Sequence, residues 1–148
     1  MENPKLVYEL YIGAPVDWVW NAIIDPELTE RYFFDSKVGS SWEVGSLVRF
    51  IEASGIIAIE GTVLEFNPPR RLAMTFRYLG DEQTQADRPS RVTWELTPAG
   101  DVTVLSLIHD DFEGETATFE FVSGGWSFIL SNLKTWLETG TTLKPEWG

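Results

Sequence analysis

Apolar and polar residues alternate along most of this chain, which is the pattern of half-buried β-strands. Residues Lys5 to Ile12 carry apolar side chains at every second position. From Val38 to His109 the alternation continues between turn residues. It predicts strands over Leu47–Ala53, Ile56–Phe66, Arg70–Tyr78, Arg91–Thr97 and Val102–His109. Antiparallel sheets commonly pack one face on a core and leave the other in water, so this meander predicts such a sheet.

Three features interrupt the meander. Gly61 lies inside the longest predicted strand, where glycine marks a bulge or a sharp curve. Residues 79–89 are polar and long for a hairpin loop, so we expect a mobile tip there. The stretch Asp110–Val122 has no clear period, and the pattern leaves open a short helix or a lid-like loop.

Helical spacing occurs near both ends of the chain. Pro15 and the pair Asp25-Pro26 each open a short helix, because proline suits the first helical position and aspartate caps a helix. The longest apolar stripe predicts a helix from Ser123 to Thr139, with Ser123 as its cap and Gly140 as its left-handed terminus. The chain therefore predicts an α+β fold.

Composition narrows the class of protein. The 148 residues fit one domain, 1–148, and contain no cysteine, so disulfides and thiolate metal sites are excluded. No apolar run is long enough for a membrane span, and no signal peptide is evident, so we expect a cytoplasmic protein that has no membrane partner. The net charge of −12 disfavours nucleic acid. Aromatic residues make up 14% of the chain and include seven tryptophans, which fill a core or line a pocket.

Four stretches in this order resemble a known family. They are Tyr11–Trp20 (YIGAPVDWVW), Asp25–Phe33 (DPELTERYF), Gly61–Leu72 (GTVLEFNPPRRL) and Gly125–Gly140. Together they look like the domain family named for the activator of the Hsp90 ATPase, a branch of the START-like (SRPBCC) superfamily. Tyr32 stands where that family usually has tryptophan. The resemblance implies a helix-grip fold: a curved antiparallel sheet of six to seven strands around a long C-terminal helix, with two short helices after the first strand.

The resemblance also implies a cavity between the sheet and the long helix for an apolar or amphipathic small molecule. It does not imply one chemistry. Three functions stay open: binding of a hydrophobic or aromatic molecule, a cyclase- or dehydratase-like enzyme, and a module that contacts an Hsp90-type chaperone. The chaperone activator pairs this domain with a separate N-terminal one, which this chain does not show. We expect no cofactor and no metal, and a monomer or weak homodimer.

Aromatic and apolar residues on the inward faces are the best candidates for a binding site. The predicted ligand-binding residues are Trp126, Tyr78, Phe76, Met74, Trp94, His109, Phe112, Phe50, Trp42 and Leu130. For each of them, core packing is the alternative explanation. Trp42, Phe50 and Phe112 are expected near the loops that rim the opening, and Tyr78 or His109 would be the polar group of the pocket.

Few residues suit acid–base chemistry. His109 is the single histidine, and Asp110 and Asp111 follow it. One interpretation is a base oriented by a carboxylate, and the favoured one is a structural or solvated role. An inward Glu60 would be a desolvated acid, with Gly61 deciding which way it faces. An enzyme would need two of His109, Tyr78 and Glu60 to meet inside the pocket. No serine lies in a nucleophile elbow and no phosphate-binding loop is present.

Overall fold

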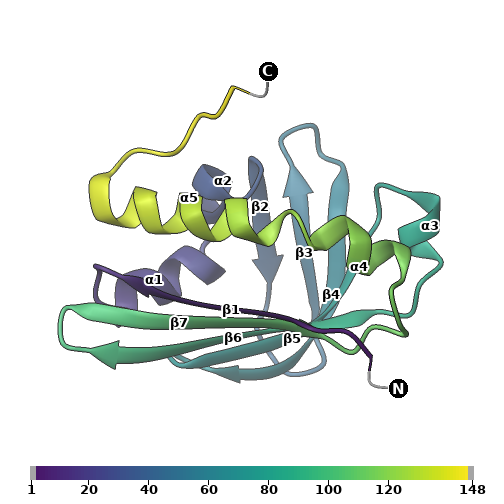
Figure 1. The fold of residues 1–148 in the computed structure, drawn as a ribbon, viewed down its shortest axis with the longest axis horizontal. Coiled ribbons are helices and arrows are strands. Elements are labelled where there is room, and N and C mark those ends of the chain that lie inside the picture. Colours follow the sequence, from purple (N-terminus) through teal and green to yellow (C-terminus); the bar gives the residue numbers. More distant parts are fainter. Residues whose placement is uncertain (1–2, 147–148) are drawn as a thin grey trace.

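The computed structural model describes residues 3–146 and has seven antiparallel strands, wrapped under one long helix (Figure 1). The strands are β1 (Leu6–Ile12), β2 (Ser36–Ser40), β3 (Leu47–Glu52), β4 (Ile57–Asn67), β5 (Arg71–Tyr78), β6 (Ser90–Ala99) and β7 (Val102–Asp110). Their order in the sheet is β1-β7-β6-β5-β4-β3-β2, so the first two strands form opposite edges. The predicted α+β class and the helix-grip arrangement are confirmed.

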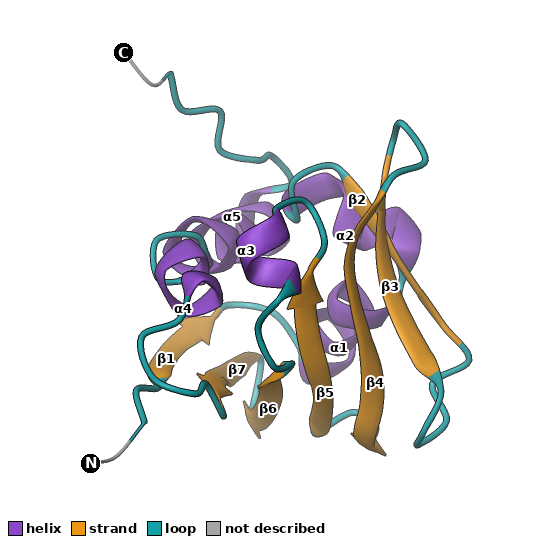
Figure 2. Ribbon diagram, turned by 90° about the vertical axis from the view of Figure 1, so that its right-hand side faces the viewer, coloured by secondary structure: helices purple, strands orange, loops and turns teal. Residues whose placement is uncertain are grey.

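Five helices accompany the sheet within the described residues. They are α1 (Val16–Ile24), α2 (Pro26–Tyr32), α3 (Glu82–Gln85), α4 (Ala117–Val122) and α5 (Trp126–Thr139). The two short helices α1 and α2 connect the edge strands β1 and β2. Figure 2 shows the sheet curling from β1 round to β2, with the helices on its inner side.

Local sequence explains the helix ends that were predicted. The Asp25 carboxylate accepts a hydrogen bond from the Glu27 amide at 2.9 Å, and Pro26 occupies the first turn of α2. Gly140 ends α5 in the left-handed conformation, at φ 83°. Pro15 precedes α1 as its N-cap instead of occupying its first helical position.

Curvature of the sheet has a local cause. The β3–β4 register shifts between Phe50 and Ile51, and the β4–β5 register shifts between Val63 and Glu65. A side chain at Gly61 would lie 1.8 Å from the Thr75 carbonyl oxygen, so only glycine permits the two backbones to approach this closely. These irregularities bend β4 and let the sheet wrap around the helix, as a bulge does.

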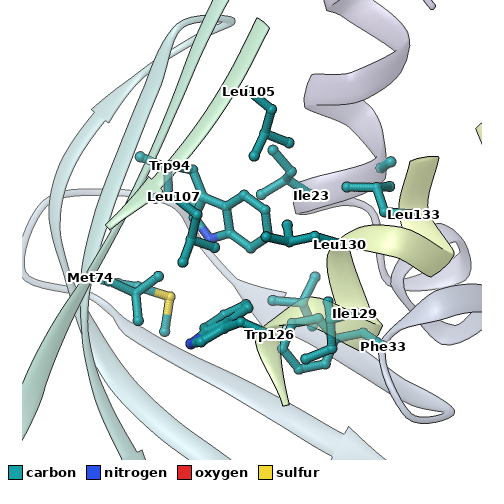
Figure 3. Close-up of a cluster of buried hydrophobic side chains, with 14 of the residues drawn as sticks. Ile23, Phe33, Met74, Trp94, Leu105, Leu107, Trp126, Ile129, Leu130 and Leu133 are labelled. Atoms are coloured by element: carbon teal, nitrogen blue, oxygen red, sulfur yellow. The ribbon is translucent and has the colours of Figure 1, made fainter. Parts of the chain in front are cut away.

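The core fills most of the space between the sheet and α5. Leu130 and Leu133 project from α5 toward Leu105 and Leu107 on β7, and all four are buried. Figure 3 shows Trp126 at the start of α5, between Met74 on the sheet side and Phe33 and Ile129 on the other. Val92, Trp94 and Leu96 alternate along β6 and are all buried, as expected of the inward face of a half-buried strand.

Two predictions for the second half of the chain need correction. The last helix begins at Trp126, not Ser123, because α4 occupies Ala117–Val122 and Ser123 ends it as C-cap. The two glycines after Ser123 separate α4 from α5, as expected of the residue with the poorest helix propensity after proline. Residues 79–89 are not a plain loop. They contain α3, where the buried Thr84 donates a hydrogen bond to the Tyr78 carbonyl at 2.9 Å.

None of the helices in residues 3–146 combines the length and the apolar character that crossing a membrane requires.

Candidate functional site

A cavity of about 430 Å³ lies where the sheet curves away from the start of α5. Its walls come from the segment after α2, from the ends of β3, β4 and β5, from the end of α4 and from the first turn of α5. The lining residues are Phe33, Phe34, Ser36, Glu52, Ala58, Ile59, Phe76, Tyr78, Phe121, Val122, Gly125, Trp126 and Ile129. We call this space the aromatic cavity, because six of these residues carry aromatic rings.

Strand pairing brings the sheet side of the aromatic cavity together. Ile59 on β4 lies opposite Phe50 of β3 and opposite Tyr78 of β5, so the ends of the three strands form one wall. Alternation along β5 points Phe76 and Tyr78 to the same face, and both line the cavity.

Aromatic contacts close the helix side. The Tyr78 ring stacks on Phe121 of α4, with centroids 4.1 Å apart and planes 17° from parallel. The Phe33 ring meets Trp126 edge to face at 6.0 Å. Phe34 and Phe121 remain 58% and 51% exposed, which places them where the aromatic cavity opens to solvent. Aromatic side chains therefore surround the opening. The stacked and edge-to-face contacts between their rings are favourable arrangements for aromatic pairs.

His109 lies behind this wall. It is fully buried and bonded on both ring nitrogens: the Trp126 indole donates to Nδ1 at 3.0 Å, and Nε2 lies 2.7 Å from the Ser90 hydroxyl. Because indole nitrogen only donates, Nδ1 must be the acceptor and Nε2 carries the proton. The Ser90 hydroxyl in turn donates a hydrogen bond to the Phe76 carbonyl oxygen.

Burial lowers the pKa of His109 to about 3, against a smaller opposing effect of Asp110, which favours the charged form. The imidazole is therefore neutral at physiological pH, and both nitrogens are occupied. His109 holds Trp126 in place and presents no free nitrogen to a substrate. The functional alternative of a carboxylate-oriented base is not what the contacts show, because Asp110 pairs with Arg91 at 2.9 Å and Asp111 with Arg88 at 3.1 Å.

Glu60 also lies outside the aromatic cavity. Its carboxylate accepts a 2.9 Å bond from Arg49 on the neighbouring strand, and its side chain is 36% exposed. The partner strand β5 carries Arg77 directly opposite. Glu60 therefore belongs to a charged row on the outer face, and the inward orientation that would have made it an acid does not occur.

The structure separates the residues predicted for the ligand site into two groups. Three of them line the aromatic cavity: Trp126, Tyr78 and Phe76. Seven do not: Met74, Trp94, His109, Phe112, Phe50, Trp42 and Leu130. Of the three expected at the rim, Phe112 and Phe50 are buried, against His109 and Phe33 respectively, and Trp42 stacks on Phe66.

Most lining residues were not found from the sequence. Phe33, Phe34 and Ser36 follow α2, where no periodic pattern assigns a face. Phe121 and Val122 lie in the stretch that the sequence left between a helix and a lid-like loop. Ile129 lies in the apolar stripe that predicts the last helix, and that stripe is the sequence signal for this wall.

Hydrogen bonds anchor the start of α4, the helix that carries Phe121. One oxygen of the Asp87 carboxylate accepts from the Thr118 amide at 2.9 Å and from its hydroxyl at 2.7 Å. Thr116 caps the same end of α4 through its side chain. Asp87 thus joins the α3 region to α4, and α4 contributes Phe121 and Val122 to the cavity.

Other hollows have different chemistry. One of them, of about 650 Å³, lies between α2 and the segment after α5, and its lining includes Glu30, Arg31, Asp35 and Lys144. It is polar and shallow. Within residues 3–146 no group of histidine and acidic side chains is placed to hold a metal ion. The aromatic cavity is therefore the best-formed binding site for a small organic molecule.

A curved antiparallel sheet that grips a C-terminal helix around an apolar cavity defines a protein of the helix-grip, START-like class. The chain belongs to the family described as "Activator of Hsp90 ATPase homolog 1-like protein", whose sequence model matches residues 13–138. The resemblance read from the four sequence stretches is confirmed. The comparison with curated proteins gives no match.

Three solved structures illustrate the proteins that share this fold. CalU16 from Micromonospora echinospora is 26% identical over 92% of this chain and 77% of its own, with a TM-score of 0.71. MLL2253 from Mesorhizobium loti is 25% identical over 95% of this chain and 100% of its own, with a TM-score of 0.76. PFC0360w, an HSP90 activator from Plasmodium falciparum, is 21% identical over 90% and 96%, with a TM-score of 0.73.

Proposed function

We propose that this protein binds a hydrophobic or aromatic small molecule in the aromatic cavity. The observation that carries this proposal is the lining: six aromatic rings and several aliphatic side chains around about 430 Å³. Cavities of roughly 300–1,000 Å³ with mostly apolar walls and a few polar groups are typical of sites for small organic molecules. The family to which the chain belongs has a fold that supports such binding.

The geometry favours binding over acid–base catalysis. A cyclase- or dehydratase-like enzyme would need at least two of His109, Tyr78 and Glu60 inside the cavity. Only Tyr78 lines it, while His109 is sequestered by Trp126 and Glu60 pairs with Arg49 on the outer face. Two of these three groups therefore lie outside the cavity, and the acid–base pair that this alternative requires is not assembled.

Contact with an Hsp90-type chaperone is the second candidate function, and family membership is the observation that favours it. A mixed assay tests it directly. Added protein would change the ATPase rate of an Hsp90-type chaperone if this function is present, and an unchanged rate across a wide concentration range would dismiss it.

Thermal shift with a panel of neutral aromatic compounds and lipids tests the binding proposal. A compound present at about 100 times its Kd adds roughly 2.7 kcal/mol to the free energy of unfolding, which is several degrees in Tm for a domain of this size. Ala58→Phe would fill the cavity with a ring and abolish the shift. Ala99→Phe adds the same ring at an exposed position of β6 and is the matched control.

The expected result is stabilisation of the unmodified protein and of Ala99→Phe, with none for Ala58→Phe. No stabilisation by any compound in the panel would remove the support for this function. Equal stabilisation of all three proteins would place binding elsewhere on the molecule.

A further inference from the structure

The polar groups that line the aromatic cavity select a kind of ligand. Four lining side chains carry nitrogen or oxygen: Ser36, Glu52, Tyr78 and Trp126. Two of these are already engaged within the protein. The Ser36 hydroxyl donates to the Phe33 carbonyl at 2.6 Å, and the Trp126 indole donates to His109.

The other two polar groups are available to a ligand. Within residues 3–146, neither the Glu52 carboxylate nor the Tyr78 hydroxyl has a hydrogen-bonding or ionic partner. Glu52 ends β3 and is exposed, at the same end of the sheet as Tyr78. A carboxylate only accepts hydrogen bonds, so the group that it recognises must be a donor.

Charge sharpens this preference. Among the described residues, those that line the aromatic cavity include one carboxylate and no lysine, arginine or histidine. The whole chain carries a net charge of −12, so the surrounding field also favours cations over anions. The aromatic faces act in the same direction, because the negative face of a ring attracts an ammonium group.

We propose that the aromatic cavity binds an organic amine: an apolar or aromatic body held inside, with its ammonium group at the mouth beside Glu52 and the rings of Tyr78 and Phe121. This proposal rests on the proposed function and specifies its ligand class. An apolar carboxylic acid of the same size would bring its negative charge to Glu52, without a cation to offset the repulsion.

Three naphthalene compounds of nearly equal size separate the two proposals. Naphthylmethylamine is cationic at neutral pH, naphthylmethanol is neutral, and naphthoic acid is anionic. Affinities are measured by isothermal titration calorimetry at low ionic strength. An exposed ion pair and a ring–cation contact are each worth a few-fold in affinity. We therefore expect the amine to bind about tenfold more tightly than the acid, with the alcohol between them.

Substitutions assign the preference to one residue. Glu52→Gln is expected to weaken amine binding by about threefold to fivefold and to weaken alcohol binding by a smaller factor, because the alcohol carries no charge. Glu9→Gln removes the same charge from an exposed position of β1, outside the cavity, and is expected to change neither affinity. Raising the salt concentration should reduce the amine's advantage, since an exposed charge is screened.

The outcomes are distinct. If the alcohol binds but amine and acid bind equally well, the amine proposal is overturned and the binding function stands. Tightest binding of the acid would overturn the amine proposal in the same way, as would a Glu52→Gln effect no larger than that of Glu9→Gln. If none of the three compounds binds, the proposed function itself loses its support.

Discussion

The single histidine of this chain provides a sharp test of the structure, because its burial makes stability depend on pH in a window set by its own pKa. His109 has an ordinary pKa of 6.5 when unfolded and a pKa of about 3 in the folded protein, chiefly because it is buried. Between these values the unfolded chain binds a proton that the folded chain does not. Stability therefore rises with pH in this window and is lost as the pH falls below 6.5.

The magnitude follows from that difference in pKa. Each pH unit below 6.5 costs about 1.36 kcal/mol, so lowering the pH from 8 to 5 should reduce the free energy of unfolding by about 2 kcal/mol. Glu138 does not contribute in this range. Its pKa is lowered by hydrogen bonds from Lys134 and the Gly13 amide, so its stabilisation is lost only below its unfolded value of 4.5.

Urea unfolding at pH 8 and pH 5 measures the loss, and the proton NMR signal of the one imidazole reports its protonation directly. His109→Gln should lose less stability than the unmodified protein over the same pH interval, whatever its stability at pH 8. A titration midpoint near 6.5 in the folded protein would refute the buried, neutral imidazole, as would equal pH dependence in both proteins.

Two further predictions concern the frame of the cavity. Gly61→Ala should cost several kcal/mol in urea unfolding, because the added methyl would collide with the Thr75 carbonyl oxygen. Gly39→Ala, where nothing lies within 4 Å, should cost little, and equal losses would contradict the close approach. Asp87→Ala should cost about 1–2 kcal/mol and speed amide exchange in α4, because the Thr118 amide and hydroxyl lose their acceptor. Unchanged exchange in α4 would show that Asp87 does not hold this helix.

Local chemistry accounts for the parts of the fold that the sequence predicts well. Asp25 and Pro26 specify the start of α2 through their own side chains and ring, and Gly140 ends α5 through its backbone conformation. Reliance on local chemistry is also why the predicted start of α5 was wrong. Ser123 is a good cap by type, but Thr116 already caps α4 and Gly125 begins α5 without a side-chain bond. Residue types alone do not show which of two adjacent helices a capping residue belongs to.

The site was harder to predict than the fold. Alternation along β5 shows that Met74, Phe76 and Tyr78 share one face, but it does not show which of them the helix covers. Met74 and Phe76 are both buried in the core, but only Phe76 and Tyr78 line the cavity. The bond between Trp126 and His109 joins residues 17 positions apart, and the bond between His109 and Ser90 joins residues 19 apart. The first pair depends on how α5 crosses the sheet, and the second depends on the register between β6 and β7.

The ligand-binding claim is tested most directly by NMR of the protein with bound naphthylmethanol. Ile59 and Ile129 line the aromatic cavity from opposite walls, so their methyl groups should both show nuclear Overhauser contacts to the naphthalene ring. Contacts confined to the groove beside Trp18 and Leu137, at the far end of α5, would contradict the account. The absence of any contact at saturating ligand would contradict it equally.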